Sequence, residues 1–186
     1  MKTIKSLSEN IYIVNKSKFI SLAYPVSYED ECKKHLSEVS SKYSDATHIC
    51  YAYILSTPRV EKCSDNGEPS GTAGRPMLEV LKKKNLENVL IVVVRYFGGK
   101  KLGAGGLIRA YTTSANSVID TSEIVEYKPK FICNIVCDIK NGDKAKNIIS
   151  RNNGNIIDIK YSDKVDITYE VESKEIEGEI TRELWK

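Results

Sequence analysis

No stretch of this sequence is apolar for long enough to cross a membrane. The longest aliphatic run, residues 89–94, is far shorter than the ~20 residues that a transmembrane helix requires. Charged and polar residues also interrupt residues 1–16, so we expect no secretory signal there. The sequence therefore predicts a cytoplasmic protein that does not associate with membranes.

Histidine is rare, and the cysteines show no ligand spacing: there are 2 histidines and 5 cysteines, with no CxxC motif. A bound metal usually needs several such residues at set spacings, so we expect no metal ion, and we expect no other cofactor. Cys133 and Cys137 fall on one face of an expected strand, about 13 Å apart at ~3.3 Å per residue, which is too far for a disulfide. The odd count favours reduced thiols, as in the cytosol.

Acidic residues are scarce in one stretch of an otherwise balanced chain. The net charge is only +3, which does not by itself indicate a nucleic-acid partner. Between Lys82 and Arg109, however, seven basic residues stand against one acid, Glu87. A local basic excess of this kind is typical of a surface that meets anions.

The first two thirds of the chain alternate strand-like and helix-like segments. β-Branched and aromatic residues predict strands, and apolar residues that recur every three or four positions predict helices. The strand expected at 87–97 is apolar on both faces through Val94, which is typical of the centre of a sheet. The patterns place strands at 17–26, 47–55 and 87–97, helices at 28–44, 77–85 and 105–122, and a polar loop at 57–76.

A linker around Pro129 separates this part from a second one with a different texture. Its strands are predicted at 131–139, 155–161 and 165–171, and its helices at 143–153 and 174–185. The order β-α-β-β-α is that of a ferredoxin-like fold without its last strand, which would leave an open sheet edge. We therefore predict an α+β protein with two domains, residues 1–126 and 130–186.

The segment RYFGGKKLGAGGLIRAY, residues 95–111, combines glycines with cations. A strand is expected to end near Tyr96 and a helix to open at Gly105 and Gly106. Glycines admit close approach to the backbone, and a helix N-terminus attracts anions. No standard phosphate-loop motif is present, so two readings stay open: an anion site, or a tight turn that lets the helix lie close to the sheet.

The segment SDNGEPSGTAGRP, residues 64–76, is too long for a simple connector, and such loops are often functional. Asp65 and Glu68 could bind a hard cation or act as acid and base. Alternatively, both carboxylates could cap amides of the loop and pair with Arg75. We favour a functional surface here, without assigning it catalysis.

His48 and Cys50 fall on one face of the expected strand at 47–55, with Asp45 just upstream. A Cys–His pair can supply a thiolate nucleophile. Side chains two residues apart on one strand stand side by side, however, and rarely reach hydrogen-bonding geometry. A structural histidine is the favoured interpretation.

Four segments resemble the Impact/YigZ family: SKFI at 17, DATHICYAY at 45, SDNGEPSGTAGRPMLEVL at 64, and NVLIVVVRYFGGKKLGAGGLIRAY at 88. The resemblance, to the bacterial members, implies an N-terminal α+β domain similar to those of ribosomal proteins, ribonuclease P protein and domain IV of elongation factor G. It also implies a ferredoxin-like C-terminal domain resembling domain V of that factor. Eukaryotic relatives are expected to regulate translation during amino-acid stress by competing for a partner of an initiation-factor kinase. For bacterial relatives, nucleic-acid or ribosome binding follows only from likeness of fold.

Two positions depart from the pattern that the resemblance implies. Lys18 stands where an arginine is expected, and Asn66 stands where a second aspartate is expected. If a carboxylate at position 66 held a cation or a proton, the corresponding activity of this chain should be weak.

These patterns favour a binding protein over an enzyme. We expect it to engage RNA or ribosomes in stress-related translation regulation, with Tyr96 and Phe97 as stacking faces and the C-terminal sheet as a second RNA-facing surface. Two alternatives stay open: an enzyme for a phosphorylated or nucleotide substrate that uses Asp65, Glu68 and His48, and a regulator that binds a translation-factor protein. The residues expected around an anion are Arg75, Arg95, Gly98, Gly99, Lys100, Lys101, Gly103, Gly105, Gly106 and Arg109.

Overall fold

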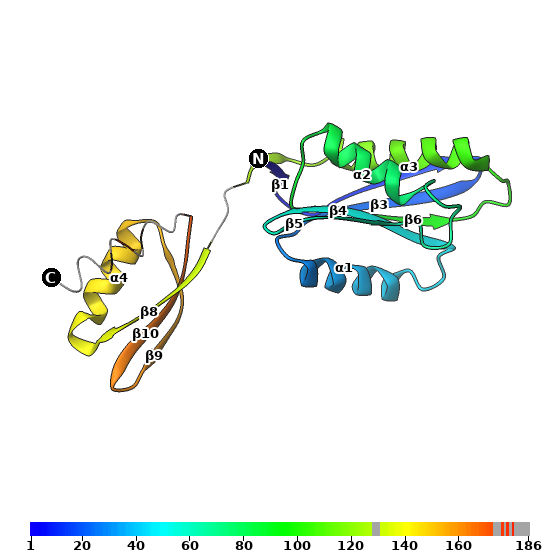
Figure 1. The fold of residues 1–186 in the computed structure, drawn as a ribbon. Helices are drawn as coiled ribbons and strands as arrows, with labels where there is room; N and C mark the ends of the chain where they lie inside the picture. The colour runs from blue at the N-terminus through cyan, green and yellow to red at the C-terminus, as the bar shows by residue number, and fades with distance from the viewer. Residues whose placement is uncertain (128–130, 173–175, 177, 179, 181–186) are drawn as a thin grey trace. The chain divides into compact units, whose positions relative to one another are not determined.

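The chain forms two compact units, Met1–Tyr127 and Lys128–Lys186. The structure, a computed structural model, describes residues 1–127 and 131–172, together with Ile176, Gly178 and Ile180. The helix predicted at 174–185 lies largely outside these described residues. Both units combine strands and helices, which confirms the mixed α/β class (Figure 1).

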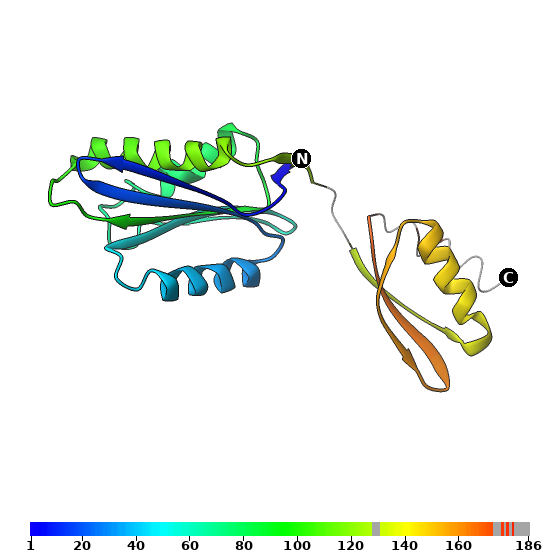
Figure 2. The ribbon, with the colours of Figure 1, turned by 180° about the vertical axis from the view of Figure 1, so that it is seen from behind.

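The first unit is built on a five-stranded antiparallel sheet in the order β2-β3-β6-β4-β5. Helices α2 and α3 cover one face of the sheet and α1 covers the other, as the two opposite views show (Figures 1 and 2). A short antiparallel pair of strands, β1 and β7, completes the unit. The elements are β1 (Lys2–Ile4), β2 (Ser8–Val14), β3 (Ser17–Pro25), α1 (Glu29–Lys42), β4 (His48–Ser56), β5 (Arg59–Ser64), α2 (Gly74–Lys83), β6 (Val89–Tyr96), α3 (Gly103–Asp120) and β7 (Ile124–Glu126).

The central strand β6 explains why both faces of the sheet are covered. Val89, Ile91 and Val93 point into the core beneath α2 and α3, while the residues between them point toward α1. A strand with apolar side chains on both faces has to be buried on both, since each face would otherwise lie in water. The prediction of a central strand at 87–97 is confirmed.

Several predicted boundaries were wrong. The segment 57–76 is not all loop, because β5 pairs with β4 along its length. As an edge strand with mostly exposed residues, β5 lacks the apolar alternation that identifies strands from sequence. Helix α2 begins at Gly74 rather than at 77, and α3 begins at Gly103 rather than at 105. Strands β1 and β2 were not predicted at all.

The second unit contains a three-stranded antiparallel sheet in the order β8-β10-β9. Helix α4 packs on one face of it, over Cys133, Cys137 and Ile167. This strand order is that of a ferredoxin-like fold with its first three strands. The elements are β8 (Phe131–Asp138), the 3-10 helix η1 (Ile139–Asn141), α4 (Gly142–Arg151), β9 (Asn155–Tyr161) and β10 (Lys164–Val171).

All five cysteines are free thiols, and Cys63 is the exposed one among them. The expectation that Cys133 and Cys137 do not form a disulfide is therefore confirmed. Within the described ranges, no helix is both long enough and apolar enough to cross a membrane.

Candidate anion site at the start of helix α3

The loop between β6 and α3 makes a sharp turn that needs glycine. Gly99 and Gly103 have φ angles of 81° and 72°, in the left-handed region that other residues rarely adopt. At Gly98, an added Cβ would lie 2.0 Å from the carbonyl carbon of Lys16, so the loop packs directly on the β2–β3 turn. These three glycines therefore have structural roles, as the tight-turn reading expects.

Gly105 differs from the other glycines, because the space beside it is open. Beyond its own helix backbone, the nearest atom to an added Cβ is Nη1 of Arg109, at 3.9 Å. Gly106 is more confined, with Cβ of Leu102 at 3.0 Å. The amides in the first turn of a helix have no intrahelical acceptors, and the N-cap residue of α3 supplies no side-chain acceptor to them. This turn is the part of the segment where an anion could approach the backbone.

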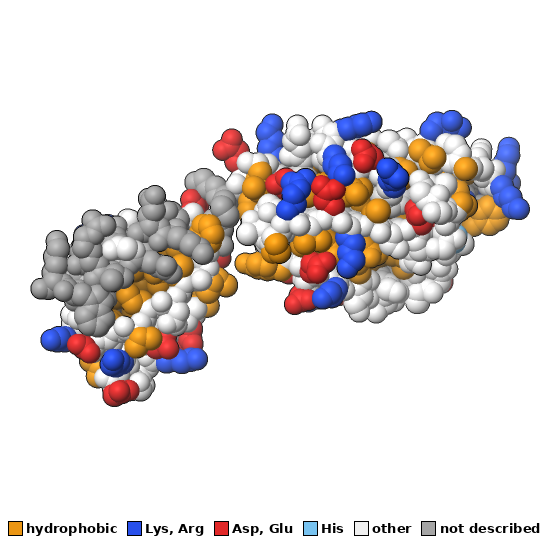
Figure 3. Space-filling view, viewed as in Figure 1, with side chains coloured by type: hydrophobic (Ala, Val, Ile, Leu, Met, Phe, Trp, Pro, Cys, Tyr) orange, Lys and Arg blue, Asp and Glu red, His pale blue; other side chains and the backbone are white. Residues whose placement is uncertain are grey.

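Lys100, Lys101 and Arg109 surround this helix start as exposed cations. Salt bridges elsewhere in the described chain involve other lysines and arginines, and none of these three has an acidic partner among the described residues. Figure 3 shows lysine and arginine side chains along the layer of α2 and α3 and at the end of the unit where the β6–α3 loop turns. These cations are therefore free to meet an external anion.

Arg95 has a different place from the other predicted cations, because it is only 5% exposed. Its Nη1 donates to Oε1 of Glu68 at 2.6 Å, and its guanidinium lies 5.4 Å and 5.5 Å from the ring centroids of Phe19 and Phe97. A buried arginine of this kind needs such a partner, since an unpaired charge in the interior is costly. Its charge is neutralised inside the protein.

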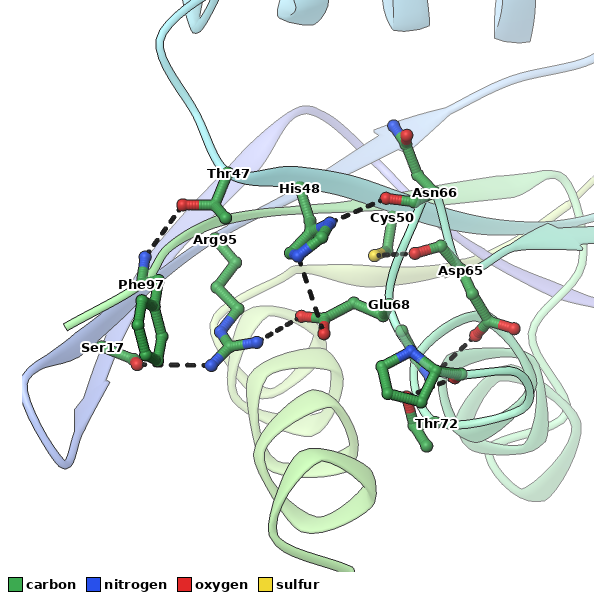
Figure 4. Close-up of polar contacts among 12 residues, drawn as sticks. Ser17, Thr47, His48, Cys50, Asp65, Asn66, Glu68, Thr72, Arg95 and Phe97 are labelled. Carbon is green, nitrogen blue, oxygen red and sulfur yellow. Dashed lines mark hydrogen bonds and ion pairs between the residues drawn. The ribbon is translucent and has the colours of Figure 1, made fainter. Parts of the chain in front are cut away.

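Glu68 is the centre of the polar network below the loop (Figure 4). Its Oε1 also accepts from the hydroxyl of Tyr111 at 2.8 Å, and its Oε2 lies 3.8 Å from Nε2 of His48. The Glu68 side chain is 3% exposed. The interpretation that Glu68 pairs with Arg75 was wrong, because folding brings Arg95 from the central strand into that place.

Asp65 binds its own loop rather than a neighbouring cation. Oδ2 accepts from the amide of Gly71 at 2.7 Å, and Oδ1 accepts from the amides of Ala73 at 2.9 Å and Gly74 at 2.8 Å. Burial tends to raise the pKa of this carboxyl, but the three amides prevail and lower it. Asp65 thus caps the start of α2, as the alternative reading of the loop expects.

His48 and Cys50 have separate partners. Nδ1 of His48 lies 2.9 Å from the carbonyl oxygen of Asn66, and the Cys50 thiol donates to the carbonyl oxygen of Asp65 at 2.9 Å. Burial raises the pKa of Cys50 to about 12, so the thiol stays protonated near neutral pH. Burial, together with Cys50 and Glu68, likewise raises the pKa of Tyr111. The geometry favours a structural role for this histidine over a thiolate pair.

A cavity of about 410 Å³ opens between the β6–α3 loop and the loop that carries Glu68. It brings together six of the predicted residues, which are His48, Glu68, Arg95, Phe97, Lys101 and Gly103. Asp65, Lys100, Gly98, Gly99, Gly105, Gly106 and Arg109 are outside its lining. Sequence reasoning missed Thr47 and Leu107 in its wall and Tyr111 beneath it, since Tyr111 showed only as one apolar position of a helix.

Arg75 lies elsewhere, in a groove of about 380 Å³ between α2 and α3. Lys83 and the exposed side chain of Ile108 line the same groove. Among the described residues no cluster of three or more His, Cys, Asp or Glu side chains could hold a metal ion.

The fold and this site define a two-unit α/β protein with a basic, glycine-rich helix start. A family model, the Impact N-terminal domain, matches residues 15–119. The chain is similar to IMPACT family member YvyE of Bacillus subtilis, with 40% identity over 174 residues, 93% of this chain and 80% of that protein. It is also similar to IMPACT family member YigZ of Escherichia coli, with 30% identity over 151 residues, 80% of this chain and 74% of that protein.

A crystal structure described as that of a hypothetical protein has the same fold over nearly the whole length. The TM-score is 0.79 at 26% identity, over 98% of this chain and 90% of that chain. With the family model matching more than half of the residues, the chain belongs to the Impact family.

Proposed function

We propose that this protein binds RNA through a basic face and acts in this way in the regulation of translation. The basic face consists of Arg75, Lys83, Lys100, Lys101 and Arg109. The observation that carries the proposal is that all five are exposed, and that none has an acidic partner in the part of the chain described.

The cations of the basic face come from α2, from α3 and from the loop before α3, and Glu79 is an acid in the groove between the two helices. Arg75 and Lys83 line the groove between the two helices, and Lys100 and Lys101 stand in the loop just before α3. Neighbouring lysines such as Lys82 and Lys84 are instead paired with Glu61 and Asp120. Because unpaired cations keep their full charge for a ligand, such a face attracts the evenly spaced charges of a phosphate backbone.

The open turn at the start of α3 adds directional contacts. Free amides of a helix N-terminus bind phosphate oxygens, and the open space at Gly105 leaves room for one there. Arg95 is excluded from the proposed phosphate contacts, because Glu68 already neutralises it. The outer face of the second unit's sheet carries both signs of charge, with Nζ of Lys160 3.9 Å from Oδ2 of Asp158, so the RNA-facing surface is assigned to the first unit.

Membership of the Impact family supports a role in translation regulation in general. Catalysis is not proposed, since the candidate residues have structural partners: Asp65 is held by three backbone amides, and Glu68 by Arg95 and Tyr111. A face that binds RNA gives a physical means of acting on the translation machinery.

The experiment is a salt titration of binding to a short single-stranded RNA. Each phosphate contact should contribute about 0.7 to the slope of log affinity against log salt, so replacing Lys100 and Lys101 with alanine should flatten the slope by about 1.4. The matched control is Lys33→Ala with Lys34→Ala, which removes the same charge from α1 on the opposite face of the sheet. Its slope should stay that of the wild type.

An unchanged slope in the folded Lys100/Lys101 variant would refute RNA binding by this face. Equal flattening in both variants would show that only net charge matters. If the protein instead bound one protein from the translation machinery and salt did not weaken that binding, the alternative of a protein-binding regulator would replace the proposal.

A further inference from the structure

In the cavity beside His48 and Glu68, a ring nitrogen of the neutral histidine and a carboxylate oxygen face each other as two hydrogen-bond acceptors, with no donor from the described residues between them. The carbonyl oxygen of Asn66 can only accept, so Nδ1 of His48 carries the proton in their 2.9 Å contact. In the neutral imidazole, Nε2 is then an acceptor. It lies 3.8 Å from Oε2 of Glu68, which is longer than a hydrogen bond.

Among the described residues no donor lies within hydrogen-bonding distance of Oε2 of Glu68, although the side chain is only 3% exposed. The other oxygen, Oε1, already has two donors in Arg95 and Tyr111. Glu68 lines the cavity, so a ligand there could supply the donors that the protein does not give to this oxygen. A donor nitrogen about 2.9 Å from both acceptors would sit about 2.2 Å off the line that joins them. A single amino group meets this geometry with its two N–H bonds.

The wall of the same cavity offers an aromatic face and a positive edge. Phe97 is 45% exposed, and the Arg95 guanidinium lies 5.5 Å from its ring centroid, which holds the ring from one side. Lys101 and Gly103 line the cavity at the start of α3. The cavity therefore offers acceptors for an amino group, an aromatic face for a flat ring, and a cation and helix amides for a phosphate.

We infer that this cavity takes one nucleotide with an amino-bearing base. The exocyclic amino group of adenine, guanine or cytosine donates to Glu68 and His48, the base stacks on Phe97, and the phosphate meets Lys101 and the first amides of α3. Uracil lacks the amino group and places carbonyl oxygens beside Glu68. The cavity volume of about 410 Å³ is within the range of small-ligand sites, about 300–1,000 Å³.

The inference rests on the proposed function, in that an unstacked base of RNA can supply the nucleotide, but a free nucleotide has the same chemistry. Calorimetry on the full chain should show AMP binding about tenfold more tightly than UMP, because hydrogen bonds to a charged group are lost with uracil. Phosphoethanolamine, which has an amine and a phosphate but no ring, should bind more weakly than AMP. The assignment would be overturned if UMP or phosphoethanolamine bound as tightly as AMP, or if AMP did not bind.

Three variants locate the site. Phe97→Ala should weaken AMP binding about fivefold or more, since stacking contributes that much per base. His48→Phe removes one acceptor, leaves the Glu68–Arg95 pair intact, and should reduce the preference for AMP over UMP. Lys83→Ala, in the groove between α2 and α3, should weaken RNA binding and leave AMP binding unchanged. AMP binding that is insensitive to Phe97 and His48 would place the ligand elsewhere and refute the inference.

Oligoadenylate and oligouridylate of equal length separate the two sources of the nucleotide. If RNA supplies it, oligoadenylate binds more tightly, and Phe97→Ala abolishes the difference. If a free nucleotide is the ligand, the protein binds AMP more tightly than UMP, while the two oligonucleotides bind with equal affinity. AMP selectivity with no RNA affinity at all would refute the proposed function and leave the nucleotide site standing.

Discussion

Replacing Asp65 with alanine should lower the free energy of unfolding of the first unit, because this one carboxylate accepts hydrogen bonds from three backbone amides. Two of these amides belong to Ala73 and Gly74, which are buried at the start of α2. An unsatisfied buried amide costs about 1–3 kcal/mol, so we expect a loss of about 3 kcal/mol after relaxation. For a unit of this size, that corresponds to a fall in Tm of about 12 °C. Asp65→Asn keeps one acceptor oxygen and should lose about half as much.

The pH dependence gives a second readout. The folded pKa of Asp65 is lowered, so its contribution to the free energy of unfolding is complete above the unfolded value of 3.8 and is lost as pH falls through the folded value. Urea unfolding should therefore separate wild type from Asp65→Ala fully at pH 7 and less at pH 3.

The control for this prediction is Asp120→Ala, which removes an exposed carboxylate paired with Lys84. Surface pairs of this kind contribute about 0–1 kcal/mol, so the control should stay close to wild type. An Asp65→Ala protein with the stability of the wild type would refute the structural role of this carboxylate.

Three further predictions concern the loop, the unit boundary and the thiols. Gly98→Ala should lower the urea midpoint, because the new Cβ would lie 2.0 Å from backbone of Lys16, whereas Gly105→Ala should be tolerated in open space. A similar loss in both variants would contradict the packing described. Limited proteolysis should cut first between residues 126 and 131 and leave a folded N-terminal fragment, since each unit has its own core; a first cut within α3 would contradict this. Iodoacetamide should modify exposed Cys63 in the native protein and spare Cys50, whose pKa burial raises to about 12; equal rates would show that Cys50 is accessible.

The sequence was sufficient where local patterns and burial agree. The apolar run of β6, the amphipathic α1 and the strict alternation of β10 each identified an element of the fold. Strand β5 was not predicted because its residues are mostly exposed and it is held by backbone pairing with β4, which leaves no apolar pattern in the sequence. Strand β2 alternates half-buried with exposed residues, and its exposed residues include Ile11 and Ile13, so its inner face does not stand out.

The candidate site divides in the same way. Sequence alone identified the glycine-rich turn, the basic excess around it and the acidic loop, because each lies within one short segment. Tertiary structure decided which charges stay available. Glu68 meets Arg95 across 27 residues and Tyr111 across 43, and no local pattern records such distances along the chain. A cation can bind a ligand only if the fold leaves it exposed and unpaired, and that depends on what packs against it. Arg95 is buried and paired with Glu68, while Lys100 and Lys101, five and six residues further on, remain at the surface.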